Sequence, residues 1–140
     1  FRVYLEDVRS PFNVGSVFRS AEAFGVAEIL LSPFCADPGH PRAERSAMGT
    51  TRTVPWRRAG LADLEGLGPL VALELGGEPL DSFPFPSEGV LAVGSEELGL
   101  SPDLLARCGY RVSIPMGGSK ASLNLGVAFG IAARAWFAFF

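Results

Sequence analysis

A loop of small residues near the end of the chain contains its single lysine, Lys120. Residues 114–122 read IPMGGSKAS, and a long apolar segment follows them. Gly117 and Gly118 carry no Cβ, so they suit a sharp turn before a buried helix, and they suit equally well a ligand that lies against the backbone. The chemistry that such a loop could support is the binding of a ligand by backbone groups.

Other familiar arrangements of functional residues do not fit the sequence. No G-x-G-x-x-G fingerprint stands between the first predicted strand and helix, and GGSKAS lacks the spacing of a phosphate-binding P-loop. The only histidine, His40, lies in a loop rich in proline and glycine, with no partner predicted for general-base chemistry. Cys35 and Cys108 are far apart in the sequence, which predicts neither a disulfide nor a metal site and favours a reducing, cytoplasmic setting.

Apolar runs alternate with helical patterns along the chain. The 140 residues, of which 48% are hydrophobic and 19% charged, suit a folded chain with one core, so we expect a single domain over residues 1–140. Continuous apolar strands between helices predict an α/β fold with a mostly parallel sheet and helices on both faces. The predicted strands are 3–5, 27–31, 52–56, 70–75, 89–96 and 110–116, and the predicted helices are 13–25, with Asn13 as its N-cap, 61–67, 101–108 and 123–140.

Four polar or glycine-rich segments follow predicted strands. They are residues 5–13, 73–78, 93–99 and 114–122. In open parallel sheets, ligands bind beyond the carboxyl ends of the strands. The sequence therefore predicts that the site lies where these segments gather.

Three stretches carry a more specific signal in combination. They are residues 13–26 (NVGSVFRSAEAFGV), 93–100 (VGSEELGL) and 113–132 (SIPMGGSKASLNLGVAFGIA). In order and spacing they resemble the three motifs of the SpoU (TrmH) family of RNA methyltransferases, within the SPOUT superfamily, and RSAMGT at 45–50 resembles the short linker motif of that family. The resemblance covers nearly the whole chain. One departure is Gly126, which stands where many members have the second serine of Ser-Leu-Asn-Val-Ser.

The resemblance implies a function and an architecture. It implies transfer of a methyl group from S-adenosylmethionine to the 2′-hydroxyl of a ribose in tRNA or rRNA, without a metal. It also implies a homodimer that associates through the C-terminal helix, and a deep trefoil knot in the C-terminal half of the chain. Knotted chains are rare, so the residues by themselves predict only the α/β sheet.

The same resemblance gives roles to five residues. Arg19 is placed at the reacting ribose, and Asn13 helps to hold the loop of the first motif. Because an arginine stays protonated in almost any protein, anchoring a phosphate is an easier role for Arg19 than acting as a base, and both stay open. Glu96 matches the glutamate of the second motif, where a carboxylate can orient a hydroxyl or a guanidinium. Ser122 and Asn124 match the third motif, in which Ser122 could also cap the terminal helix.

Two further sets of residues complete the predicted site. An adenine ring needs an apolar slot with a few amide and carbonyl partners, and the ends of the late strands supply one. The residues expected to bind the cofactor are Leu73, Glu74, Gly76, Gly94, Ile114, Met116, Ser122 and Leu123, and those expected to bind RNA are Arg9, Arg19, Arg42, Arg45, Arg52 and Lys120.

Basic residues are concentrated in one stretch of a chain whose net charge is −3. Between residues 42 and 58 there are five arginines and one glutamate, which gives a local charge of +4. Such a stretch could follow a phosphate backbone. A solvated surface with ordinary ion pairs has the same composition, so the charge alone leaves both interpretations open.

The apolar C-terminal segment predicts an interface and not a membrane anchor. Residues 123–140 are short for a membrane span and contain Asn124 and Arg134. A buried or subunit-facing helix fits them better, and the apolar end of the segment favours a homo-oligomer. The first residues lack the basic and apolar regions of a secretory signal, in agreement with the cytoplasmic expectation.

Two other functions remain as alternatives. A non-catalytic RNA-binding or assembly protein could retain the same fold, although the presence of the five motif residues argues against it. An α/β enzyme that uses another nucleotide is disfavoured by the missing glycine fingerprints. At the level of single residues, Arg19 could simply pair with Glu22 on a helix surface, and Glu96 could be a solvated loop acid.

Overall fold

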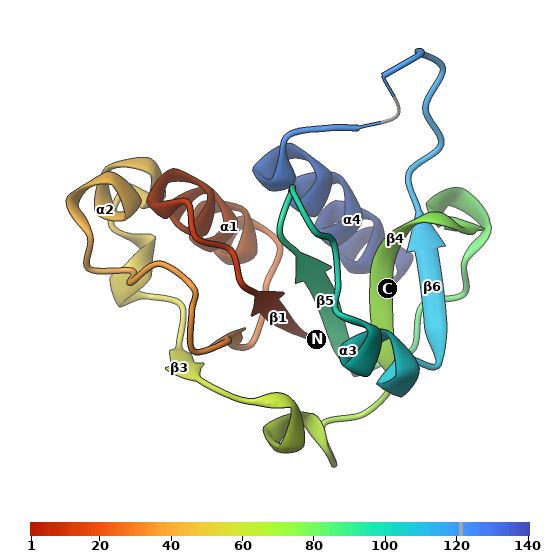
Figure 1. Ribbon diagram of the computed structural model, residues 1–140, viewed down its shortest axis with the longest axis horizontal. Coiled ribbons are helices and arrows are strands. Elements are labelled where there is room, and N and C mark those ends of the chain that lie inside the picture. The colour runs from red at the N-terminus through yellow and green to blue at the C-terminus, as the bar shows by residue number, and fades with distance from the viewer. Residues whose placement is uncertain (121) are drawn as a thin grey trace.

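The computed structural model describes residues 1–120 and 122–140. In this part of the chain, six strands form one sheet in the order β3-β2-β1-β5-β4-β6, and all neighbouring strands are parallel (Figure 1). The expected α/β fold with a parallel sheet is therefore confirmed. The strands are β1 Arg2–Glu6, β2 Ile29–Leu31, β3 Trp56–Arg58, β4 Leu70–Pro79, β5 Val90–Gly94 and β6 Tyr110–Ser113.

Helices cover both faces of the sheet. Helix α1 (Pro11–Ala23) and helix α4 (Leu125–Phe139) pack side by side on one face, while α3 (Pro102–Arg107) and a short 3₁₀ helix, Leu61–Leu64, lie on the other. Helix α2 (Pro41–Ala47) packs against α1 on the side away from α4 (Figure 1). The sheet is thus the middle of three layers, as predicted.

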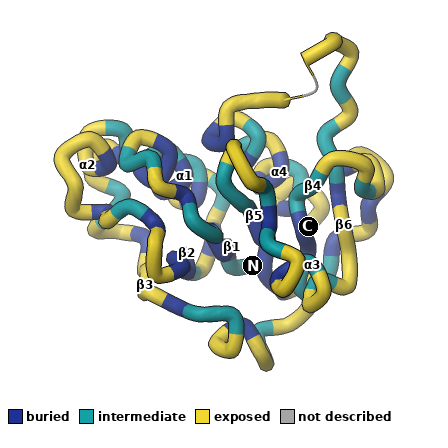
Figure 2. Tube along the Cα trace, in the orientation of Figure 1, coloured by how far each residue is buried: buried dark blue, intermediate teal, exposed yellow. Residues whose placement is uncertain are grey.

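The alternation of side chains along β1 shows why both faces are apolar. Val3 and Leu5 point to the face covered by α1, where they pack in one core cluster with Phe18. Tyr4 points to the opposite face and packs in a second cluster with Leu104 of α3. In Figure 2, buried residues are concentrated along the central strands of the sheet. Burying such large apolar side chains contributes about 1.5–3 kcal/mol each, so the sheet is a rigid support for the loops at its edge.

Three local expectations were wrong. Helix α1 begins at Pro11 with Ser10 as its N-cap, because the Ser10 hydroxyl accepts a hydrogen bond from the Asn13 N–H at 3.2 Å. Asn13 is therefore not the N-cap, and its side chain is available for other contacts. The predicted strand 52–56 lies instead at Trp56–Arg58, and residues 61–67 form only the 3₁₀ helix. The N-cap of α1 is Ser10 because Pro11 suits the first position of a helix, so the cap is the residue before it.

Helix α2 was not predicted from the sequence. It follows a proline-rich loop and begins at Pro41, with the His40 ring accepting a hydrogen bond from the Arg42 N–H at 3.1 Å. It ends at Ala47, since Met48 adopts a left-handed conformation with φ of 51°. Only seven residues long, it offers too few turns for an apolar period to stand out.

Strand β4 contains an excursion that shapes the edge of the sheet. Leu73 and Glu78 both pair with Val112 of β6, so the chain loops out between them and then resumes the same pairing. The Ser113 hydroxyl donates a hydrogen bond to the Gly77 carbonyl at 2.8 Å and fixes the return. Residues 74–77 consequently form a bulge within β4 that lies outside the pairing with β6.

The helices of the described residues were compared with the length and apolarity that a membrane span requires. Over 1–120 and 122–140, the helices are each too short or too polar to be candidate membrane spans. The apolar helix α4 instead buries Phe129 and Trp136 against the sheet, and the Trp136 indole N–H donates a hydrogen bond to the Pro86 carbonyl at 3.1 Å. Its apolar character is thus partly explained by the core.

Candidate functional site

A cavity of about 390 Å³ lies at the carboxyl ends of β4, β5 and β6. Its walls come from the excursion of β4, the loop after β5 and the segment that links β6 to α4. Seven of the eight residues expected to bind a cofactor line it, and Gly76 does not. The seven are Leu73, Glu74, Gly94, Ile114, Met116, Ser122 and Leu123.

Sequence reasoning missed several other residues of this cavity. Most of them belong to the loop after β5, and two come from the first turns of α4. The loop was expected at the site, but the sequence did not indicate which of its side chains face inward. The additional lining residues are Leu75, Val93, Ser95, Glu96, Glu97, Leu98, Gly99, Leu125 and Ala128, of which Glu96 had been expected in a catalytic role.

The loop after β5 is folded tightly onto the end of its strand. The Gly99 N–H donates a hydrogen bond to the Ser95 carbonyl at 2.9 Å, and the Leu98 N–H donates to the Ser95 hydroxyl at 3.1 Å. A Cβ placed on Gly94 would come within 2.4 Å of the Gly99 backbone. Glycine at position 94 therefore permits the loop to fold this closely onto its strand.

A second anchor holds the far end of this loop. The Glu6 carboxylate, at the end of β1, accepts hydrogen bonds from the Ser101 N–H and the Ser101 hydroxyl, both at 2.7 Å. The Ser101 hydroxyl also caps α3, since it accepts a hydrogen bond from the Leu104 N–H at 3.2 Å. The loop is thus fixed at both ends, which limits the reorganisation needed when a ligand binds.

Three of the predicted catalytic residues meet at one carboxylate. Glu96 Oε1 accepts hydrogen bonds from the Leu125 N–H at 2.8 Å, from Asn13 Nδ2 at 3.3 Å and from Asn124 Nδ2 at 3.4 Å. Asn124 Nδ2 also lies 3.4 Å from Asn13 Oδ1. Because each of the three comes from a different motif, this cluster joins the first helix, the loop after β5 and the terminal helix. Glu96 is therefore not merely a solvated loop acid.

The cap of α4 is Asn124 and not Ser122. Asn124 Oδ1 accepts hydrogen bonds from the Gly126 N–H at 2.9 Å and from the Val127 N–H at 3.4 Å. Ser122 lies outside the helix and lines the 390 Å³ cavity. The capping alternative for Ser122 is thus wrong, and Ser122 belongs instead to the wall of the cavity.

Arg19 shares a groove with one member of this cluster, Asn124. It is exposed on α1 and lines a groove of about 740 Å³ between α1 and α4, together with Phe12, Val127 and Ile131. Among the described residues, no ion pair joins Arg19 to Glu22. Within one chain, the structure therefore does not bring Arg19 together with Glu96, and the simple surface pair is not formed either.

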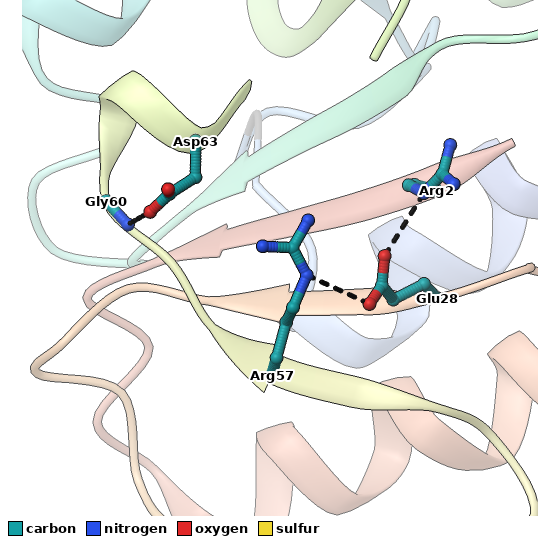
Figure 3. A network of polar contacts seen from close by, with 5 residues as sticks. All are labelled: Arg2, Glu28, Arg57, Gly60 and Asp63. Atoms are coloured by element: carbon teal, nitrogen blue, oxygen red, sulfur yellow. Dashed lines mark hydrogen bonds and ion pairs between the residues drawn. The ribbon is translucent and has the colours of Figure 1, made fainter. Parts of the chain in front are cut away.

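The basic stretch divides into two parts. Arg57 and Arg2 both pair with Glu28, at 3.0 and 3.1 Å, so they link the strands β1 and β3 across β2 (Figure 3). Arg58 donates hydrogen bonds to the carbonyls of Ser32 and Cys35 at 3.1 and 2.8 Å. For these arginines the structure supports the interpretation as a surface with ordinary ion pairs and hydrogen bonds.

The other predicted RNA-binding residues are exposed. Arg42 and Arg45 lie on α2, and Arg52 ends a short 3₁₀ helix, Thr50–Arg52. Over residues 1–120 and 122–140, the ion pairs that form involve none of these three side chains. Lys120 is exposed in the segment before α4, and Arg9 lies over the ring of Phe34. Their charges are thus available to an anionic partner.

A metal centre has no support in the described part of the chain. No three His, Cys, Asp or Glu side chains gather there in a way that could hold a metal ion. The cavity offers instead apolar walls, exposed backbone and the carboxylates of Glu74 and Glu96. This donor set fits an organic cofactor with a flat ring and hydroxyl or ammonium groups better than it fits a cation alone.

Comparison with known proteins gives consistent matches over the chain. The profile of the SpoU rRNA Methylase family matches residues 1–134. A 23S rRNA (uridine(2479)-2′-O)-methyltransferase of Streptomyces viridochromogenes is 33% identical in an alignment of 127 positions, which covers 82% of this chain and 44% of that protein. An AdoMet-bound rRNA methyltransferase from Sinorhizobium meliloti superposes with a TM-score of 0.90 at 32% identity, over 96% of this chain and 54% of that one.

A third match has nearly the same length as this chain. It is a structure concerned with 2-OH methylation of C/U34 on tRNA, with a TM-score of 0.86 and 31% identity, and it covers 97% of this chain and 93% of that chain. By contrast, the chain spans half or less of the length of the first curated relatives, 49% and 44%. Their remaining segments have no counterpart in these 140 residues.

Proposed function

Since the chain belongs to the SpoU rRNA methylase family, we propose that it transfers a methyl group from S-adenosylmethionine to the 2′-hydroxyl of a ribose in tRNA or rRNA. The observation that carries this proposal is the junction of Glu96, Asn13 and Asn124 beside a cavity that contains seven of the predicted cofactor residues. The three motifs thus meet at one place in the fold, although they are far apart in the sequence.

The cofactor would occupy the 390 Å³ cavity. When bound, S-adenosylmethionine supplies an activated methyl group on a sulfonium. Leu73, Ile114 and Leu123 would contact its adenine ring, and backbone groups around Gly94 would accept and donate its hydrogen bonds. Glu74 and Ser122 line the same cavity, and their carboxylate and hydroxyl would hold its polar end. Gly76 lies in the bulge of β4, and its contact with the cofactor stays a prediction.

The task of the protein is then to position the ribose and to lower the cost of removing one proton. Holding the hydroxyl in line with the methyl group can supply a large part of the rate enhancement. Arg19 stays protonated at neutral pH, so it would bind the ribose phosphate and stabilise negative charge near the oxygen. Asn13 and Glu96 would act on this chemistry by holding the loop after β5 against α1 and α4.

A homodimer through the C-terminal helix would complete the site. The groove that contains Arg19 is lined by apolar side chains whose exposed fractions are high for their type, 55% for Phe12, 51% for Val127 and 42% for Ile131. Exposed apolar surface of this kind marks an interaction face. A second copy on this face would bury Arg19 at the interface, and the acceptor ribose would be held between two chains.

RNA would approach over the basic residues that have no internal role. Arg42, Arg45, Arg52 and Lys120 would contact phosphates, and Arg9 would do so closer to Asn13, with which it lines a cavity. A chain of net charge −3 needs such a local concentration of positive charge to bind a polyanion.

Three finer features belong to this proposal. Residues 1–140 would form one SPOUT catalytic domain, supported by the continuous sheet. The trefoil knot is supported by the contact of Glu96 with Leu125, which places the start of the terminal helix against the loop after β5. A cytoplasmic location would fit an RNA substrate and the two free cysteines.

Calorimetric titration with S-adenosylmethionine and with its demethylated product is the first test. We expect about one site per chain at micromolar strength or tighter, followed by transfer of a tritiated methyl group to fractionated tRNA or rRNA. The Arg19→Ala variant should keep its affinity for the cofactor, and its rate of methylation should fall by about 100-fold. Arg107→Ala, on the opposite face of the sheet, should methylate RNA at the parent rate. A folded dimer that ignores both ligands would instead favour a non-catalytic RNA-binding protein.

A further inference from the structure

One large aromatic side chain is exposed close to the proposed site without packing into the core. Phe34, in the turn after β2, is 68% exposed. The guanidinium of Arg9, which follows β1, lies 5.4 Å from the centre of its ring. An arginine over an aromatic face leaves the second face of the ring free, and both groups are planar surfaces on which a nucleobase can stack.

The turn that carries Phe34 is fixed by hydrogen bonds. The Cys35 N–H donates to the Ser32 carbonyl at 3.1 Å, and the Ala36 N–H donates to the Val8 carbonyl at 2.9 Å. Arg58 donates to the carbonyls of Ser32 and Cys35, on both sides of Phe34. Because the backbone is held on both sides, the exposure of the ring is a property of the fold and does not result from a loose loop.

A further contact ties this turn to the end of β1. The Asp7 N–H donates a hydrogen bond to the Ser32 hydroxyl at 2.8 Å, and that hydroxyl donates to Asp7 Oδ1 at 3.1 Å. Asp7 itself has a φ of 53°, a left-handed conformation that turns the chain toward Arg9. Phe34 and Arg9 therefore come together through a defined junction of two loops.

The position of Arg9 connects this pair to the site of methyl transfer. Arg9 lines a second cavity, of about 300 Å³, together with Ser10 and Asn13. This cavity shares part of its wall with the cofactor cavity, through the loop after β5 and the first residue of α4. The shared residues are Ser95, Glu96, Glu97, Leu98 and Leu125.

The charges around the pair indicate which part of an RNA would lie there. The second cavity contains the carboxylates of Asp7, Glu96 and Glu97, which disfavour a phosphate inside it. Uncharged groups, such as a ribose or a base edge with donor groups, suit it better. Arg42 and Arg45 follow the Phe34 turn on α2 and are exposed, so phosphates can be held outside the cavity while a base contacts the ring.

We propose that Phe34 and Arg9 form a stacking platform for an unpaired base that flanks the acceptor nucleotide of a single-stranded RNA segment. The proposal rests on the proposed function, because it requires an RNA substrate. Stacking on an aromatic side chain needs no particular base, so the platform would select unpaired over paired RNA and would contribute little to the choice of sequence.

The test compares Phe34→Ala and Phe34→Trp with Tyr110→Ala, a control at an aromatic residue that is 49% exposed at the start of β6, outside the proposed site and the proposed dimer interface. The probes are a short oligouridine that carries one 2-aminopurine, read by fluorescence quenching, and total tRNA or rRNA as methyl acceptor. We expect Phe34→Ala to weaken RNA binding and raise KM for RNA by about 5- to 100-fold. Phe34→Trp should retain both, and calorimetry should give the same affinity for S-adenosylmethionine in all variants.

Other outcomes would overturn the platform in distinguishable ways. If the parent protein methylates RNA and Phe34→Ala binds and methylates it equally well, the platform is wrong and the proposed function stands. If Phe34→Ala loses the dimer by sedimentation while Phe34→Trp keeps it, the ring belongs to a protein interface. If the parent protein neither binds S-adenosylmethionine nor methylates RNA, both proposals fail together.

Discussion

The carboxylate of Glu96 accepts a hydrogen bond from the backbone N–H of Leu125 at 2.8 Å. This contact joins the loop after β5 to the first residue of the terminal helix, 29 positions further along the chain. An acidic group at a helix N-terminus is favourable, because it pairs with unsatisfied N–H groups and with the positive end of the helix dipole. Glu96 therefore has a definite structural role beside any role in chemistry.

Replacement of Glu96 should reveal both roles. Glu96→Ala removes the acceptor for three donors, so we expect a loss of about 1–2 kcal/mol in the free energy of unfolding and a strong loss of methylation. Glu96→Gln keeps one acceptor oxygen and should lose less stability. Urea unfolding of the two variants, with Glu97→Ala as a control at the exposed neighbour, checks this. Equal stability of Glu96→Ala and Glu97→Ala would show that the contact with Leu125 contributes nothing.

Two glycine residues at the site should differ sharply in how well they tolerate substitution by alanine. A Cβ on Gly94 would lie 2.4 Å from the Gly99 backbone, whereas a Cβ on Gly118 meets no atom within 4 Å. We expect Gly94→Ala to displace the loop after β5 and to weaken S-adenosylmethionine binding by about 10-fold or more. Gly118→Ala should bind as the parent does. Calorimetry on both variants is the measurement, and a tight-binding Gly94→Ala would mean that the loop does not shape the cofactor cavity.

The long-range architecture was predictable where patterns in the sequence are strong. Apolar runs such as residues 89–96 gave the strand β5 and its glycine-rich continuation, and parallel strands have their carboxyl ends at one edge. The cofactor cavity follows from that rule. The helix α2 and the short β3 were missed or misplaced, because elements of three to seven residues carry too little periodicity.

The contacts within the site were less accessible to sequence reasoning. Asn13, Glu96 and Asn124 could be selected as polar motif residues, but their meeting depends on how α1 and α4 pack. Ser10 and Asn124, not Asn13 and Ser122, turned out to be the caps, since each cap is decided by one hydrogen bond. Phe34 had no signal at all, because an isolated aromatic residue in a loop has the same appearance whether it is buried or exposed.

Gly126 offers a test of how the departure from the usual third motif is accommodated. A Cβ on Gly126 would lie 2.9 Å from Ser16 Cβ and 3.3 Å from Asn124 Oδ1, so α1 and α4 are in close contact there. We expect Gly126→Ser to lower the free energy of unfolding by about 1–3 kcal/mol. The double variant with Ser16→Gly should recover part of the loss, because it removes the opposing side chain. Additive effects in a double-mutant cycle would contradict this direct contact.

Tyr4 should make the protein sensitive to alkaline pH. Burial on the α3 side of the sheet, with a smaller effect of Glu6, raises the pKa of Tyr4 to about 12, and its hydroxyl donates a hydrogen bond to the Ala59 carbonyl at 3.2 Å. The pKa in the folded state exceeds the unfolded value of 10.0, so this contribution is complete below pH 10 and is lost as the pH rises toward 12.

The Tyr4→Phe variant isolates this effect. At neutral pH it should be less stable than the parent by about 1 kcal/mol, because the hydrogen bond is missing. As the pH rises above about 10, the parent should lose stability faster, and the difference between the two should shrink. Urea unfolding of both proteins at a series of pH values measures this difference in stability. A constant difference over this range would mean that Tyr4 does not titrate as proposed.

The apolar groove between α1 and α4 leads to a prediction about assembly. Ile131 is 42% exposed on α4, in the groove that also contains Arg19. We expect Ile131→Arg to convert a dimer into monomers, because a charge placed in the centre of an apolar interface is desolvated without a partner. Trp56→Arg, at the exposed edge strand β3, serves as the control. Sedimentation gives the oligomeric state, and methylation should fall with the dimer if the acceptor ribose is held between two chains. A monomeric Ile131→Arg that methylates RNA at the parent rate would place the complete site within one chain and would remove the dimer from the mechanism.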